Sequence, residues 1–157
     1  MKKIFIAILS AVLLMTACSS GKPSHDFLNV DFGMSTLEIT EAEGEASEFS
    51  APESGLLYYE NKTVFGVDNA KITYTIDESG LTFIICDYQN QYADLKSYQQ
   101  EAEIIKENMT AIYGEPSSQD DSSVMWDGTD INAGWASFLL LMPDEESTNI
   151  TIMAYGK

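Results

Sequence analysis

The chain has 157 residues and a net charge of −17, from 25 acidic residues against eight basic ones, all of them lysine. This charge repels phosphate backbones, and no arginine is present to bind base edges, so we predict no nucleic-acid partner. The same charge opposes direct adhesion to anionic lipid, so any attachment to a membrane requires an acyl anchor.

The first 18 residues, MKKIFIAILSAVLLMTAC, have the pattern of a targeting segment. Lys2 and Lys3 precede an apolar run over 4–14, which is shorter than the ~20 residues that a bilayer-spanning helix needs. The small residues before Cys18 resemble the lipobox of bacterial lipoproteins, which implies cleavage before Cys18 and lipidation of its thiol. An ordinary secretory signal with an incidental cysteine is the alternative. We therefore predict an extracytoplasmic protein anchored by lipid to a bacterial membrane.

Removal of 1–18 leaves a polar segment over 19–26, which we expect to be a flexible tether, and one domain over 27–157. The mature chain then holds six lysines and 25 acidic residues, a net charge of −19. Cys86 becomes its only free cysteine. It lies in the apolar stretch LTFIICDY (81–88), so we predict a buried, unreactive thiol.

A short first helix is predicted from the segment FGMSTLEITEAEG (32–44). Ser35 and Glu38 have the spacing of a capping box, in which each side chain accepts a hydrogen bond from the backbone of the other. Gly44 can adopt the positive φ that often ends a helix. We expect this segment to be a local folding device rather than a functional site.

Strands follow this helix. KITYTID (71–77) alternates apolar and polar residues, and LTFIICDY is apolar on both faces, as expected of a central strand. LLYYENKTVF (56–65) fits either one strand or a hairpin about Glu60–Lys62. Further strands are predicted in WASFLLLM (135–142) and NITIMAY (149–155).

A longer second helix is predicted to begin after Asp94 and to end at Gly114. Its apolar stripe recurs every three or four residues and comprises Leu95, Tyr98, Ala102, Ile105, Met109 and Ile112. Glu101, Glu103 and Glu107 lie off this stripe, so we expect them to face water.

Several short matches recur in the same order about 70 residues apart, among them GEAS (44–47) with GEPS (114–117). We therefore predict an α+β fold made of a tandem α-β-β-β repeat, with units at about 27–90 and 91–157. The strands would form one antiparallel sheet of six to eight strands. Both helices would pack on one face, which leaves the other face free.

The residues Phe32-Gly33-Met34-Ser35, followed by Glu38-Ile39 and Gly44, resemble the helix start of beta-lactamase inhibitor protein. A related Gly-Met-Ser/Thr start occurs in SmpA/OmlA-type outer-membrane lipoproteins. The resemblance covers about thirteen residues and implies a duplicated helix-plus-sheet unit that binds proteins with its open sheet face. The second unit lacks the motif, and no inhibitory residue can be transferred.

Catalytic and metal-binding patterns are weak in this chain. His25 is the only histidine and lies in the tether, so no histidine-based triad is predicted inside the domain. We predict no enzyme activity, no cofactor and no assigned metal site. The segment 119–134 concentrates Asp120, Asp121, Asp127, Asp130 and Asn132, which fits either solvated loops or a divalent cation site.

Aromatic residues on or beside the strands are candidate anchors for a partner. We select Tyr59, Trp126 and Trp135 as partner-binding residues because they border acidic or glycine-rich loops. The predicted function is a non-enzymatic, lipid-anchored module that binds an extracytoplasmic protein or peptide through the open sheet face. The alternatives are a structural accessory of envelope assembly and a solute- or carbohydrate-binding lipoprotein with a tryptophan-lined pocket.

Overall fold

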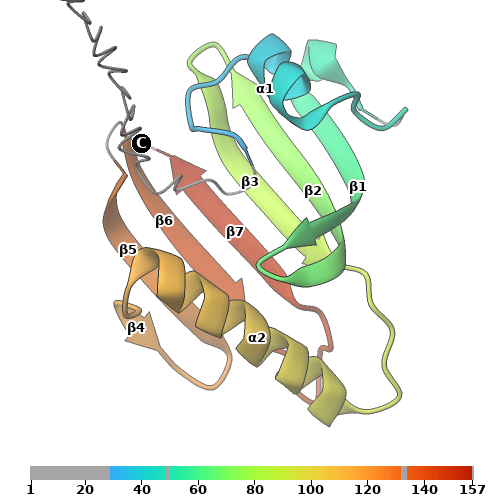
Figure 1. Ribbon diagram of the computed structural model, residues 1–157, viewed down its shortest axis with the longest axis vertical. Helices are drawn as coiled ribbons and strands as arrows, with labels where there is room; N and C mark the ends of the chain where they lie inside the picture. The colour runs from blue at the N-terminus through green and yellow to red at the C-terminus, as the bar shows by residue number, and fades with distance from the viewer. Residues whose placement is uncertain (1–28, 49, 132–133, 157) are drawn as a thin grey trace, which may run out of the picture.

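The computed structural model describes residues 29–48, 50–131 and 134–156, with side chains described outside 128–136. Seven strands form one antiparallel sheet in the order β1-β2-β3-β7-β6-β5-β4, which confirms the α+β class and the single antiparallel sheet (Figure 1). The elements are α1 (Thr36–Glu43), η1 (Pro52–Ser54), β1 (Leu56–Val64), β2 (Val67–Asp77), β3 (Gly80–Tyr88), α2 (Leu95–Tyr113), β4 (Ser118–Gln119), β5 (Ser123–Ile131), β6 (Gly134–Leu141) and β7 (Thr151–Gly156).

The predicted capping box opens α1. The Glu38 carboxylate accepts the Ser35 backbone N–H at 2.8 Å, and the Ser35 hydroxyl accepts the Glu38 N–H at 3.4 Å. The backbone hydrogen bond from Ser35 lowers the pKa of the Glu38 carboxyl. The helix ends at Gly44, which has a φ of 88°.

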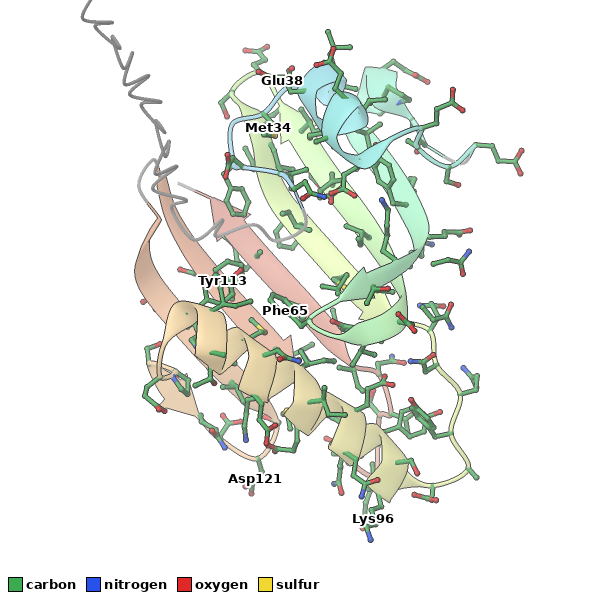
Figure 2. All side chains as sticks on the ribbon, viewed as in Figure 1. Met34, Glu38, Phe65, Lys96, Tyr113 and Asp121 are labelled. Atoms are coloured by element: carbon green, nitrogen blue, oxygen red, sulfur yellow. The ribbon has the colours of Figure 1, made fainter. Side chains whose placement is uncertain are left out.

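The residues before α1 tie the start of the domain to the sheet. The Gly33 N–H donates to the Leu81 carbonyl at 2.9 Å, and the Leu81 N–H donates to the Met34 carbonyl at 2.8 Å. Phe32 lies so close to Gly156 in β7 that a Cβ there would overlap its ring. The opening motif is therefore a structural device that joins α1 to the β2–β3 turn and to the last strand. Figure 2 shows Met34 and Glu38 at α1.

The second helix begins as predicted after Asp94, the N-cap residue, whose carboxylate accepts the Ser97 N–H at 2.9 Å. Ala102, Ile105 and Met109 are fully buried, in agreement with the predicted stripe. Ile112 is 45% exposed, because it lies in the last turn near the end of the helix. No helix in the described residues is both long and apolar enough to cross a membrane.

One buried hydrophobic cluster includes residues of the sheet and of both helices. Figure 1 shows α1 and α2 in front of the sheet, and Ile39 of α1 belongs to the same buried cluster as Ile105 and Met109 of α2. Alternate strand residues complete it: Leu57, Tyr59, Ile72, Tyr74, Ile84, Cys86, Val124, Trp126, Phe138, Leu140, Ile152 and Ala154.

The stretch 56–65 contains one strand, β1, and is not a hairpin about Glu60–Lys62. Its pairing with β2 shifts between Tyr59 and Lys62, where an extra residue forms a β-bulge and Asn61 has a φ of 56°. The chain reverses later, at Phe65–Gly66, where both residues have positive φ as in a type I′ turn. Figure 2 shows Phe65 beside Tyr113 of α2, with ring centroids 6.2 Å apart.

Candidate functional site

The strand residues that alternate with the buried set form a second face of the sheet. One row runs across five strands through register neighbours: Thr73 in β2, Ile85 in β3, Met153 in β7, Leu139 in β6 and Met125 in β5. Met125 is 38% exposed, and the other four are partly exposed. Apart from Thr73 the row is apolar, which is unusual for a solvated sheet face.

A neighbouring row adds aromatic surface. Phe83 in β3 pairs with Tyr155 in β7, and their ring centroids are 4.6 Å apart. Tyr155 is 45% exposed. An exposed tyrosine on a rigid strand presents a large contact area at a low cost in conformational entropy, so this pair is a suitable partner anchor.

Polar groups surround this apolar area. Thr151 donates to the Asp87 carboxylate at 2.7 Å, and Ser137 donates to the Asp127 carboxylate at the same distance. Across the sheet, the Lys71 ammonium lies 5.6 Å from the centroid of the Tyr58 ring. A half-buried apolar centre with a polar border is the anatomy of a protein-binding surface.

Short segments cover parts of both sheet edges. The Ser47 N–H donates to the Tyr58 carbonyl at 2.7 Å, and the Ser50 hydroxyl accepts the Tyr58 N–H at 2.9 Å. On the other side, the Ser117 N–H donates to the Met125 carbonyl at 2.8 Å. These backbone groups cannot pair with an added strand, so the face is a better candidate than the edges.

The predicted anchors Tyr59 and Trp126 are in the core, which corrects their assignment as partner contacts. Tyr59 is 3% exposed and donates to the Gly44 carbonyl at 3.1 Å. Trp126 is 1% exposed, and its indole N–H donates to the Gly114 carbonyl at 2.9 Å. Both side chains point toward the helices because they share the strand alternation of the buried residues. Trp135 lies outside the described side chains, and Cys18 lies outside the described residues.

Glu101 is also placed differently from the expectation that it faces water. Only 6% of its surface is exposed, and it accepts hydrogen bonds from the Tyr92 hydroxyl and from the Asn90 amide, the latter at 2.8 Å. Tyr92 also packs edge-on against Tyr98, at 5.0 Å between centroids. Glu101 thus fastens the β3–α2 connection onto α2, a role that helical periodicity alone does not indicate.

This contact predicts an alkaline titration. The hydrogen bond to Glu101 raises the pKa of Tyr92 to about 12. Because the pKa is about 10 in the unfolded chain, the stabilisation is complete below about pH 10 and is lost as the pH rises through about 12. The phenolate absorbance of Tyr92 is obtained by subtracting the absorbance of Tyr92→Phe from that of the wild type. We expect this difference to titrate with a midpoint near pH 12. In Glu101→Gln the midpoint for Tyr92 should fall toward 10, and an unchanged midpoint would contradict the assignment.

Cys86 is fully buried, as predicted, and burial raises the pKa of its thiol to about 12. In a Cys18→Ser variant Cys86 is the single thiol, and we expect it not to react with a thiol reagent at about pH 8 while the protein is folded. Concentrated guanidinium chloride should release one reactive thiol. Fast reaction of the native protein would show that the site opens readily.

A hollow of about 390 Å³ lies beside α1 and β1. Its lining includes Glu43, Glu45, Glu48 and Lys62, and the Lys62 ammonium is 2.6 Å from the Glu43 carboxylate. The same ammonium accounts for the cation–π contact with Tyr59, at 5.0 Å. This ion pair joins the end of α1 to β1 and is a structural contact.

The acidic segment 119–134 is partly described. The Asp120 carboxylate accepts hydrogen bonds from Ser122 and Ser123 at the β4–β5 turn, and the backbone bond from Ser122 contributes most to the lowering of its pKa. Among the side chains described, no group of three or more His, Cys, Asp or Glu residues is arranged to hold a metal ion. Asp120 therefore acts as a turn-forming residue.

The residues missed as candidates are the face residues Phe83, Leu139 and Met153, together with the anchor Tyr155. Strand alternation was the available signal, since alternate residues of one strand share a face of the sheet. Comparison with known proteins adds no assignment, because no family model, curated protein or solved structure matches the chain.

Proposed function

We propose that this chain is a non-enzymatic, lipid-anchored, extracytoplasmic binding module made of two tandem α-β-β-β units. Both helices would cover one face of the sheet, and the other face, described above, would engage a protein or peptide. The observation that carries the proposal is the contiguous apolar row on that face, which includes Ile85, Met153 and Leu139. Trp126 is in the core, which disfavours a tryptophan-lined solute pocket.

Matched helix ends support the two-unit plan. Gly44 and Gly114 have nearly the same conformation, with φ and ψ of 88° and −166° against 83° and −169°. Each glycine N–H donates to a threonine carbonyl one turn earlier, to Thr40 at 3.0 Å and to Thr110 at 2.9 Å. The two helices differ in length but end in the same way.

Matched tertiary contacts follow each helix end. The glycine carbonyl accepts a hydrogen bond from a core aromatic of the next long strand, Tyr59 for Gly44 and Trp126 for Gly114. Three residues beyond each glycine, a serine N–H donates to the same strand. The repeated glycine and serine of GEAS and GEPS thus have repeated roles.

Strand registers match as well. Tyr59 pairs with Ile72 and Trp126 with Phe138, and in each case an extra residue follows on the first strand. The bulges fall at Glu60–Asn61 and Asp127–Gly128. In the sheet order, β1-β2-β3 and β5-β6-β7 run inward from opposite sides to the central β3–β7 pair, and the short β4 lies outside β5. A pseudo-two-fold axis through that pair would relate the units.

The proposed docking face can be tested by photo-crosslinking in the native host. A photoreactive residue is placed at Met153 on the face or, as a control, at Gln99 on the exposed side of α2. The Met153 position should give one discrete protein adduct that the Gln99 position does not give. Adducts from Gln99 with none from Met153 would overturn the choice of face.

The proposed lipid anchor has its own test. Cys18→Ser should abolish incorporation of a labelled fatty acid and should move the protein from the membrane fraction to the soluble fraction. Labelling and membrane retention in Cys18→Ser would show that anchoring does not use this cysteine.

A further inference from the structure

The two units differ on the open face much more than on the core face. On the core face, apolar residues occupy matching positions: Leu57 and Val124, Tyr59 and Trp126, Ile72 and Phe138, Tyr74 and Leu140, Ile84 and Ile152, and Cys86 and Ala154. On the open face, Leu139 and Leu141 of β6 match Thr73 and Thr75 of β2. The two leucines and the two threonines occupy equivalent positions in their units, because β6 and β2 each lie one strand outside the central β3–β7 pair.

This difference distinguishes the side chains that the fold requires from those that it does not require. Thr73 and Thr75 show that the sheet accommodates polar residues at these positions. Leucine at 139 and 141 is therefore not demanded by the fold, and its partly exposed surface favours an occupant that covers it. Ile85, Met125 and Met153 extend the same area. The flexible methionines suit a contact that adapts to a partner.

The surroundings of this area are acidic at one end. The Met142 N–H donates to the Ser122 carbonyl at 2.9 Å, which joins the β6–β7 connection to the β4–β5 turn. These two connections carry exposed carboxylates: Asp120, Asp121, Asp144, Glu145 and Glu146. Asp87 lies at the same end of the face, in register through Thr151 with Leu141.

Three lysines of the described residues lie on other elements: Lys62 and Lys106 form ion pairs with Glu43 and Glu103, and Lys96 is in the first turn of α2. Lys71 in β2 lies over Tyr58 and is the register neighbour of Asp87, so the acidic character of this end rests on the carboxylates of the two connections. The end formed by Ser123 and Leu141 is thus anionic, with an apolar area beside it.

We infer that the half of the face formed by β3, β7, β6 and β5 binds a cationic, amphipathic segment of a partner protein. This rests on the proposed function and specifies its partner. Apolar side chains of the segment would cover Leu139, Leu141 and Met153, and its lysine or arginine residues would meet the acidic connections. A second copy of the chain is a poor occupant, because each copy carries the same net charge of −17.

The test compares three synthetic amphipathic helical peptides that share their apolar residues and differ only in polar residues: lysine, glutamine or glutamate. Binding of the full chain in detergent is measured by fluorescence anisotropy. We expect the lysine peptide to bind at least about tenfold more tightly than the glutamine peptide, and added salt should weaken it. Equal or tighter binding of the glutamine or glutamate peptide, or no binding of any peptide, would overturn the cationic assignment.

Two variants locate the binding. The double variant Leu139→Thr/Leu141→Thr installs the residues of the other unit. It should weaken the binding of the lysine peptide by about tenfold or more. The control Ile104→Ala/Ile112→Ala removes exposed apolar surface from α2 and should leave binding unchanged. Unfolding midpoints verify that both variants are folded. Unchanged binding of the lysine peptide by the double variant would overturn the inference. So would wild-type dimers, detected by sedimentation, that the double variant abolishes. In either case, crosslinked adducts at Met153 would still support the docking face.

Discussion

Replacing Trp126 with alanine is expected to lower the free energy of unfolding by about 3–5 kcal/mol, the usual cost of deleting a large buried aromatic side chain. Trp126 is 1% exposed. The substitution also removes the donor for the Gly114 carbonyl, which ends α2, so the helix and β5 lose a direct connection. The measurement is denaturant unfolding followed by circular dichroism.

The matched control is Tyr155→Ala, which removes an aromatic residue from the open face. Tyr155 is 45% exposed, so its loss should cost about 1 kcal/mol or less. If Trp126→Ala cost no more than Tyr155→Ala, Trp126 could not be the core residue that its burial indicates. A binding defect without a loss of stability would restore its original assignment as a partner contact.

Local chemistry explains why helix boundaries could be predicted. The capping pair Ser35 and Glu38, the Asp94 cap and the terminal glycines act through contacts within a few residues, so their signals are complete in the sequence. The bulge in β1 could not be predicted in the same way. Its position depends on the pairing of Tyr59 and Lys62 with a second strand.

The candidate site was only partly predictable for a similar reason. Alternation separates Tyr58 from Tyr59, but it does not say which of the two faces the helices cover. Proximity to acidic loops favoured Tyr59, whereas the hydrogen bond from its hydroxyl to the Gly44 carbonyl places it inside. Glu101 failed as a prediction because its partners, Asn90 and Tyr92, come from the preceding connection and not from the helix.

The second large effect is expected for Gly80→Ala at the start of β3. Gly80 has a φ of 98°, which costs an L-residue about 1–2 kcal/mol. A Cβ there would also overlap the carbonyl of Gly33, and relieving this overlap must stretch the hydrogen bonds of Gly33 and Met34 with Leu81. At about 1 kcal/mol for each bond, the total loss of stability should reach about 3–4 kcal/mol.

Gly44→Ala separates the two causes. Gly44 has a similar φ of 88°, but an added Cβ would meet no heavy atom within 4 Å. Its loss should therefore be only the backbone cost of about 1–2 kcal/mol, and the difference between the variants measures the close approach of Gly33 to Gly80. Equal losses would mean that the opening segment can shift away from β3 without cost. The docking of Phe32 on Gly156 would then hold the start of the domain without help from Leu81.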